Sequence, residues 1–376
     1  MNEKYLVVTP GYPSKENIYN NGFVHSRVKQ YIKRNMDVTV FSVDKNSKNE
    51  KYIYDDIIVN TGNLNNLEEF LKNNKFSKVL IHFGFKDTIN TILKVDKNMP
   101  LIIWVHGTEA LGWYRRLFFF DIKRPHRFLG YILLNIRQMA FMHKLINNKT
   151  INKKFVFVSE WMKNILEKDS LSKNKINDYE IIPNVVDENL FNYVEKNKKD
   201  RLNILSVRPY ASLKYANDLS VKTVLKLSEK NYFNELKFTF YGDGKLFDKT
   251  LEPIKEFKNV LVNKKFISQK EISKLHKKNG IMLIPTRQDA QGVSMCEAMA
   301  SGLVPISSNN TAIPEYLDNN SGYLCNNVEE MVNAIEEMYN NSKLFLDKSK
   351  NAYLKVNSLC NSKLVIEKEI NYIKSK

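Results

Sequence analysis

Two acidic side chains stand eight residues apart around a short polar turn. They are Asp289 and Glu297, and Gly292, Val293 and Ser294 lie between them. An apolar run precedes this turn and a run of good helix formers follows it, so the pattern predicts a strand, a turn and a helix start. Helix-start N–H groups attract phosphates, and a carboxylate accepts hydrogen bonds from a ribose diol. The segment therefore predicts a nucleotide site, with a capping Glu and a surface Asp as the alternative.

Two cations follow another predicted strand. Arg208 and Lys214 come after residues 203–207, and both could lie beside an anionic ligand. In a lysine-rich chain, the alternative is that both are surface charges. Gly242 follows residues 237–241, although a glycine after a strand is often only a tight turn.

The elements that must position these residues alternate between strands and helices along the whole chain. In the first half the predicted strands are residues 4–9, 38–43, 78–83, 101–105, 155–158 and 180–182. In the second half they are residues 203–207, 237–241, 259–262, 280–284 and 303–306. This alternation indicates an α/β protein with mainly parallel sheets.

A polar stretch without periodicity divides the two series of strands. The sequence predicts an N-terminal domain over 1–191, a linker over 192–200, a second domain over 201–342, and a C-terminal helical segment over 343–376 that packs back on the first domain. A length of 376 residues also favours two domains.

Composition narrows the class of protein. Apolar runs stay short of the roughly 18–20 residues that span a bilayer, and the chain enters a strand almost at once, so we expect a cytoplasmic protein. Cys296, Cys325 and Cys360 form no CxxC pair, which favours reduced thiols over a zinc site. The formal charge of +17 indicates an anionic partner, namely nucleic acid, a membrane surface or a phosphorylated substrate.

The motif around Glu297 resembles a known family. The Pro285-Thr-Arg lead-in, the helix Glu297-Ala-Met-Ala-Ser-Gly and the later Pro314-Glu-Tyr look like a retaining glycosyltransferase of the group 1, or family 4, type. This resemblance implies the GT-B fold, in which two Rossmann-like βαβ domains face each other across a cleft. It also implies that Glu297 holds the ribose of a nucleotide sugar. Asp289 stands where the family usually has Glu and would contact the transferred sugar.

The resemblance assigns roles to further residues. Backbone N–H groups near Val293 and Ser294, beside Gly292, would hold the diphosphate. Arg208 and Lys214 would stabilise the leaving diphosphate, and Gly242 would form a wall of the donor pocket. In the first domain, Gly22 begins a helix and would face the donor phosphate. His106 follows a strand and would lie near the reacting sugar, although a lone histidine there is more often structural.

The implied reaction moves a sugar from a nucleotide diphosphate sugar, most simply a UDP-sugar, to a hydroxyl of a glycan or lipid-linked glycan, as in cell-surface polysaccharide synthesis. The anomeric configuration is retained, and neither a metal nor another cofactor is required. A nucleotide-sugar epimerase on the same fold is an alternative. A nucleic-acid-binding protein is a third, but the sequence has no RNP-like, KH-like or helix-turn-helix pattern.

The charge excess is concentrated in one region. Residues 101–150 contain eight Lys and Arg against two Asp and Glu. Within 113–127, basic and aromatic side chains alternate in a way that favours contact with an anionic membrane surface. The predicted contact residues are Trp113, Tyr114, Arg115, Arg116, Phe118, Lys123, Arg124 and Arg127. The apolar face from Leu129 to Ala140 favours a core helix instead. Together these features predict a peripheral protein on the inner face of the cell membrane.

Overall fold

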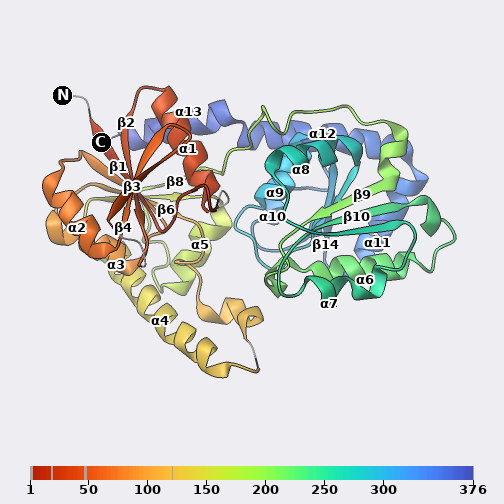
Figure 1. Ribbon diagram of the computed structural model, residues 1–376, viewed down its shortest axis with the longest axis horizontal. Coiled ribbons are helices and arrows are strands. Elements are labelled where there is room, and N and C mark those ends of the chain that lie inside the picture. Colours follow the sequence, from red (N-terminus) through yellow and green to blue (C-terminus); the bar gives the residue numbers. More distant parts are fainter. Residues whose placement is uncertain (1–2, 18–19, 46–48, 121, 376) are drawn as a thin grey trace. The chain divides into compact units, whose positions relative to one another are not determined.

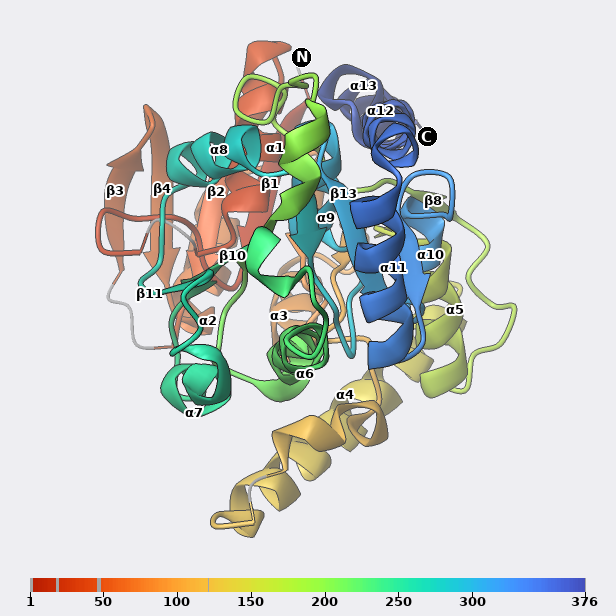
Figure 2. The ribbon, with the colours of Figure 1, turned by 90° about the vertical axis from the view of Figure 1, so that its right-hand side faces the viewer.

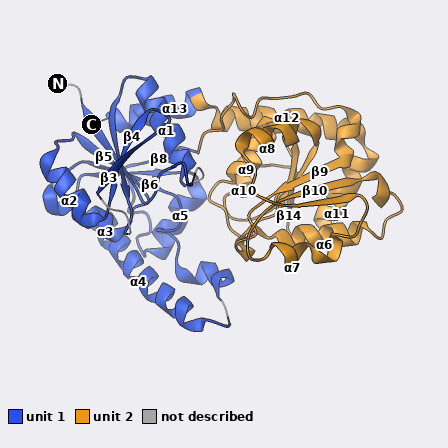
Figure 3. Cartoon of the chain, in the orientation of Figure 1, with its two compact units in different colours: residues 1–183, 363–376 blue, residues 184–362 orange. Residues whose placement is uncertain are grey.

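The computed structural model describes residues 3–17, 20–45, 49–120 and 122–375. The chain forms two compact units, shown in Figure 3. Unit 1 contains Met1–Pro183 and Lys363–Lys376, and unit 2 contains Asn184–Ser362. Each unit is an α/β layer structure with its own sheet (Figure 1).

Unit 1 has an eight-stranded sheet in which only the pair β3 and β4 is antiparallel. In sheet order the strands are β3 (Glu50–Tyr54), β4 (Ile57–Gly62), β2 (Asp37–Val43), β1 (Lys4–Thr9), β5 (Lys78–His82), β6 (Leu101–Val105), β7 (Lys153–Phe157) and β8 (Tyr179–Ile181). Its helices are α1 (Gly22–Lys33), α2 (Leu64–Asn73), α3 (Lys86–Val95), the 3₁₀ segment η1 (Trp113–Phe119), α4 (Pro125–Asn147), α5 (Glu160–Asp169) and α13 (Ser362–Lys374). The central strands are buried along nearly their whole length, as covered parallel strands must be.

Unit 2 has a six-stranded sheet that is parallel throughout. In sheet order the strands are β11 (Val260–Lys264), β10 (Lys237–Gly242), β9 (Asn203–Val207), β12 (Ile281–Leu283), β13 (Val304–Ser308) and β14 (Tyr323–Cys325). Its α-helices are α6 (Asn217–Leu227), α7 (Phe247–Leu251), α8 (Gln269–Lys278), α9 (Val293–Ala300), α10 (Ile313–Tyr316), α11 (Val328–Asn340) and α12 (Ser342–Cys360).

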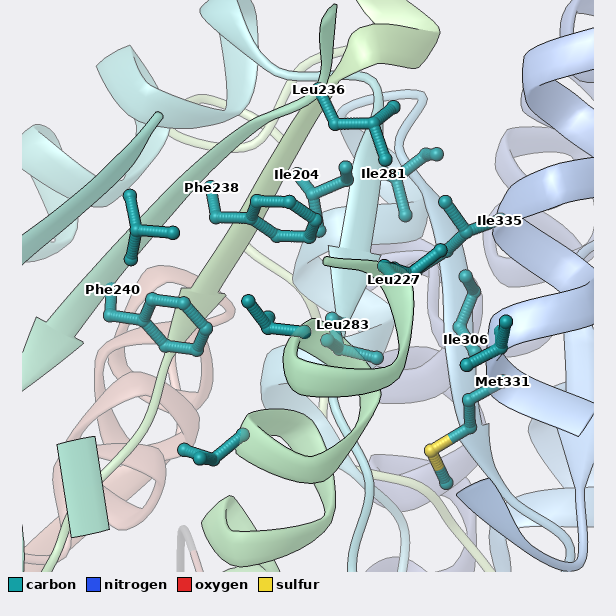
Figure 4. Close-up of a cluster of buried hydrophobic side chains, with 14 of the residues drawn as sticks. Ile204, Leu227, Leu236, Phe238, Phe240, Ile281, Leu283, Ile306, Met331 and Ile335 are labelled. Carbon is teal, nitrogen blue, oxygen red and sulfur yellow. The ribbon is translucent and has the colours of Figure 1, made fainter. Parts of the chain in front are cut away.

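Alternating side chains of the unit 2 strands fill two separate cores. Ile204 and Ile281 point to the face covered by α6, α7 and α11, part of which Figure 4 shows. Leu205 and Met282, their neighbours in sequence, point to the opposite face, where they pack with α9 and α12. This period of two is the reason that continuous apolar runs form these strands.

Every predicted strand is present, some with the predicted bounds. β6 and β9 match residue for residue. β3, β4 and β14 were not predicted from the sequence. β3 is an edge strand with a mostly exposed or half-buried pattern, and it therefore lacks the apolar run that identified the others.

The unit boundaries differ from the predicted domains. The first unit ends at Pro183 rather than residue 191, and the polar stretch 192–200 lies inside unit 2. The C-terminal segment is also divided. α12 buries Ala352, Val356 and Cys360 in the core of unit 2, so only the chain from Lys363 onward belongs to unit 1.

Within the part of the chain that the structure describes, no helix has the length and hydropathy needed to cross a bilayer. All three cysteines are buried free thiols.

Candidate active site

The N-terminus of α9 has the geometry of an anion site. Gly292 precedes the helix with a φ of 82°, and a Cβ there would come within 2.9 Å of Ile313 Cδ1. The positive φ therefore favours glycine here, and any larger residue would also have to displace the end of the Ile313 side chain. Among the described residues no side chain caps this terminus, and its first turn contains no acid. The first-turn N–H groups, including those of Val293 and Ser294, have no partner within the helix.

Asp289 shapes the turn that leads into α9. Its Oδ1 accepts hydrogen bonds from the backbone N–H groups of Gln291, at 3.2 Å, and Gly292, at 2.8 Å. Its own N–H donates to Thr311 Oγ1 at 3.1 Å. These contacts match the structural role that was the alternative at the sequence level. Contact between Asp289 and a sugar stays a prediction.

Arg208 is a buried cation beside this turn. It is 5% exposed, and its guanidinium lies 5.0 Å from the ring centroid of Tyr215. Burial lowers the pKa of Arg208, and the nearby charge of Asp289 opposes that shift. Within the described part of the chain its Nε has no hydrogen-bond partner. A buried guanidinium with an unsatisfied donor is costly, and a bound anion would remove that cost.

The loop that carries Arg208 and Lys214 is fastened to the loop before α9. The backbone N–H of Arg287 donates to the carbonyl of Lys214 at 2.9 Å. The Arg287 guanidinium also makes two parallel bonds, of 2.8 and 2.7 Å, to the Asp218 carboxylate. Lys214 Nζ lies 5.6 Å from the Tyr215 ring that Arg208 also contacts. The structure thus places Arg208 near Asp289 and joins the backbone of Lys214 to the loop that leads to Asp289. The clamp formed by Arg287 and Asp218 was missed, because those residues are far apart in sequence.

Gly242 allows this loop to pack closely. It ends β10 with a φ of 154°, and a Cβ would lie 2.0 Å from the carbonyl oxygen of Arg208 and 2.8 Å from the Tyr210 ring. The glycine is therefore needed for the backbone position of Arg208. Its role as a pocket wall stays a prediction.

Glu297 lies on α9 and is only partly accessible to solvent. Burial, and to a lesser extent the negative charge of Asp187, raises the pKa of Glu297 to about 8. At neutral pH the carboxyl group without a ligand is therefore mostly protonated. A ligand that donates hydrogen bonds to it would favour the charged form. Such a perturbed carboxyl group, on the helix whose N-terminus has the geometry of an anion site, is typical of a binding site.

In unit 1, Gly22 and His106 follow β1 and β6. The His106 ring lies 4.7 Å from the ring of Phe23, the neighbour of Gly22, so the structure brings these two predicted positions together. His106 Nε2 is 3.1 Å from His82 Nδ1, and burial lowers the pKa of both imidazoles. A Cβ on Gly22 would meet no atom of the described residues within 4 Å.

The loop that carries His106 is held by a residue that the sequence analysis missed. The fully buried Glu109 carboxylate accepts from the N–H of His106 at 2.7 Å and from that of Gly107 at 3.1 Å. Burial raises the pKa of Glu109 to about 7 against the opposing effect of these N–H groups. The only sequence signal for Glu109 is its position three residues after His106.

The chain is thus an α/β protein whose candidate anion site in unit 2 lies at the carboxyl ends of its strands, where such folds bind ligands. Residues 188–355 match the sequence profile described as Glycosyl transferases group 1. This match covers less than half of the chain and lies within unit 2, and solved structures similar to the chain show that the two units together have the GT-B fold. No curated protein matched the sequence.

Solved structures support the same fold. A mutant of S. aureus TarM in complex with UDP is 18% identical, with a TM-score of 0.61 over 84% of this chain and 59% of TarM, so the chain spans about 59% of that protein's length. Anabaena HepE in complex with UDP and glucose is 12% identical, with a TM-score of 0.71 over 100% of both chains. WaaG, involved in lipopolysaccharide biosynthesis, is 12% identical, with a TM-score of 0.69 over 99% of this chain and 100% of WaaG.

The segment between β6 and β7 carries a second candidate surface. α4 extends away from the sheet of unit 1 in both Figure 1 and Figure 2. Nine of the nineteen exposed large apolar side chains in the described residues lie here. They are Tyr114, Leu117, Phe119, Phe120, Ile122, Leu129, Leu133, Leu134 and Ile136. We call these nine residues the insertion patch. The prediction of a core helix over Leu129 to Ala140 is therefore wrong.

The predicted membrane contacts divide into two groups. Tyr114, Lys123, Arg124 and Arg127 are exposed, and Trp113 and Phe118 are half-buried. Arg116 instead turns inward, and its Nη2 donates to the Gly107 carbonyl at 3.0 Å. Arg115 pairs with the buried carboxylate of Asp169 at 2.7 Å. These two arginines therefore bond to other residues of unit 1. The prediction of membrane contact is wrong for the buried Arg116 and is weakened for the half-buried Arg115.

Proposed function

We propose that this protein transfers a sugar from a nucleotide diphosphate sugar, most simply a UDP-sugar, to an acceptor hydroxyl with retention of the anomeric configuration. The observation that carries the proposal is the N-terminus of α9, which no described side chain caps, together with the buried cation Arg208, whose charge interacts with Asp289 in the turn before that helix. This arrangement supplies N–H donors and a positive charge to one anionic group, as a diphosphate requires. UDP in the structures of TarM and HepE supports the choice of nucleotide.

In the proposed reaction, the bond between the anomeric carbon and the phosphate oxygen breaks, and negative charge develops on the departing diphosphate. Arg208, Lys214 and the N–H groups of Val293 and Ser294 stabilise that charge where it forms. Glu297 holds the ribose hydroxyls. The acceptor oxygen attacks on the face that the phosphate leaves, and a phosphate oxygen takes its proton. His106 lies near the transferred sugar.

We further propose that unit 1 docks on an anionic membrane and that the acceptor is a glycan or lipid-linked glycan of cell-surface polysaccharide synthesis. The apolar insertion patch is accompanied by the exposed cations Lys123, Arg124, Arg127, Arg137 and Lys144. Each cation near an anionic surface contributes about 1 kcal/mol, and the apolar side chains add burial in the headgroup region. The lipopolysaccharide role of WaaG supports the same class of acceptor.

A donor screen tests the transfer reaction. UDP-, GDP- and ADP-sugars are incubated with the protein and a mixture of lipid-linked glycans, and released nucleotide is measured for the wild type and Glu297→Ala. We expect acceptor-dependent release with one nucleotide class, and a large loss in the variant. An absence of release with every donor would contradict the proposal. Epimer formation without acceptor would instead identify a nucleotide-sugar epimerase.

A further inference from the structure

The helix that carries much of the insertion patch is hydrogen-bonded on its other side to the loop of His106. Gln138 of α4 donates from Nε2 to the carbonyl oxygens of Gly84, at 2.9 Å, and Glu109, at 3.3 Å. Its Oε1 accepts from the N–H of Lys86 at 3.0 Å. A single side chain of α4 therefore joins the loops that follow β5 and β6.

Two further contacts connect the same regions. Asn135 of α4 donates to the Leu111 carbonyl at 2.8 Å and accepts from the Trp113 N–H at 2.7 Å. Arg116 of η1 donates to the Gly107 carbonyl at 3.0 Å, and Gly107 also donates to Glu109. The loop that begins at His106 is thus held from outside by α4 and η1.

The two sides of α4 differ sharply in exposure. Asn135 and Met139 are buried, whereas Leu133, Leu134 and Ile136 are 61%, 66% and 51% exposed. One helix therefore presents an apolar surface to solvent and hydrogen bonds to the loop of His106. Because a helix moves nearly as a rigid element, a shift of α4 caused by binding on its exposed side also moves the side chains that bond to the loop of His106.

We propose that Gln138 is a positioning residue that couples membrane docking of α4 to the loop of His106. Anionic lipid bound to the insertion patch orders this loop, and the ordered loop raises the turnover of sugar transfer. This inference rests on the proposed function, since it assigns His106 to the transfer site and the insertion patch to the membrane. Linkage requires the reverse effect as well, so a ligand that orders the loop strengthens membrane binding.

The test uses the full chain with Gln138→Ala, and with Asn147→Ala as the matched control. Asn147 lies at the end of the same helix and bonds to the His143 carbonyl at 2.8 Å and to Ser172 Oγ at 3.1 Å, away from the loop. Each protein is mixed with vesicles of phosphatidylglycerol and phosphatidylcholine, or of phosphatidylcholine alone. The readouts are vesicle sedimentation, hydrogen exchange of amides 106–113, and nucleotide release from the best donor of the screen.

We expect anionic vesicles to slow exchange of amides 106–113 and to raise kcat several-fold in the wild type and in Asn147→Ala, with little change in the donor KM. Gln138→Ala binds the vesicles equally but loses both responses. Gln138→Glu, which keeps the size and the bond to Lys86, also loses both responses, and it serves as the second variant if Gln138→Ala fails to fold.

A full response in either Gln138 variant would overturn the coupling. So would a wild type that binds vesicles and turns over donor without any change in exchange or kcat. A wild type that neither binds vesicles nor releases nucleotide would contradict the proposed function itself.

Discussion

Glu297 combines a raised pKa with a position on α9, whose first-turn N–H groups are proposed to bind the diphosphate, and the two properties together make its chemistry testable. In the proposed complex its carboxylate accepts hydrogen bonds from ribose hydroxyls, which requires the charged form. The free protein instead holds a proton on this group up to about pH 8. Donor binding must therefore displace that proton.

The first prediction follows from this loss of a proton when the donor binds. Donor affinity should rise as the pH increases from 6.5 to about 8 and then level off, because the pKa of Glu297 is raised to about 8. Well below this pKa, each unit of pH should change affinity by about tenfold. Isothermal titration in buffers of different ionisation enthalpy would detect the released proton. Glu297→Gln should remove both effects, and an affinity that does not depend on pH would refute this role.

The second prediction concerns Arg208. Arg208→Gln removes a fixed positive charge from the site where the diphosphate leaves, so kcat should fall by roughly 100- to 1,000-fold, the loss typical of removing one preorganised stabilising group. Single-turnover kinetics with saturating donor would measure this effect. Arg201→Gln, at a half-buried arginine of the same unit that bonds to the Tyr339 carbonyl, should leave kcat near the wild-type value. Equal rates for Arg208→Gln and wild type would exclude leaving-group stabilisation by Arg208.

For single residues, the sequence predicted which residues belong to the candidate site better than it predicted which residues they contact. Arg208, Lys214 and Asp289 were identified as site candidates, and the structure does place them in neighbouring loops. The ion pair between Arg287 and Asp218 was not predicted, and neither were the hydrogen bonds from the His106 loop to Glu109. Both depend on how the chain folds back on itself, and neither has a local sequence pattern.

Among the elements, α4 is where periodicity and burial disagree. Its apolar side chains repeat at helical spacing, which favoured a core helix, yet Leu129, Leu133 and Ile136 are exposed. Periodicity reveals that a helix has an apolar face but not what covers that face. The strands were easier to predict, because those covered on both faces are apolar along their whole length.

The third prediction tests the insertion patch. Leu133→Glu places a negative charge on an exposed apolar position, so it should abolish binding to anionic vesicles while leaving the thermal unfolding midpoint nearly unchanged. The matched control is Leu261→Glu, because Leu261 is a similarly exposed leucine in unit 2. Vesicle sedimentation at low and high salt measures both variants. Equal loss of binding in the control, or none in Leu133→Glu, would contradict docking through α4.

At the scale of the whole molecule, the C-terminal segment comes back to unit 1, where a buried ion pair joins it to α1. Arg27 of α1 donates to the Glu369 carboxylate of α13 at 3.0 Å, and both side chains are fully buried. Tyr31 and Trp104 also donate to this carboxylate. Arg27 bonds in addition to the carbonyl of Pro183, the last residue before the chain leaves unit 1. The contacts of Glu369 were not predictable, since the three side chains that donate to it are more than 260 residues away in sequence.

The fourth prediction follows from this network. Glu369→Ala leaves Arg27 as a buried charge without its main partner, so the free energy of unfolding should fall by about 3–5 kcal/mol. Denaturant unfolding monitored by circular dichroism would measure the change. Lys368 lies on the same helix as Glu369 and forms an exposed ion pair with Glu180 of β8. Lys368→Ala, which removes this pair, should have little effect. Similar losses in both variants would argue against a special role for the buried pair.

The central claim is that unit 2 binds a nucleoside diphosphate at α9, and a direct titration tests it. UDP, GDP and ADP are titrated above pH 8 into the wild type, Glu297→Gln and the surface control Glu229→Gln. We expect at least one nucleotide to bind the wild type and the control equally. Its affinity should fall by roughly tenfold or more in Glu297→Gln, the loss expected for hydrogen bonds to a charged group. Failure of all three nucleotides to bind, or equal affinity in Glu297→Gln, would contradict the claim.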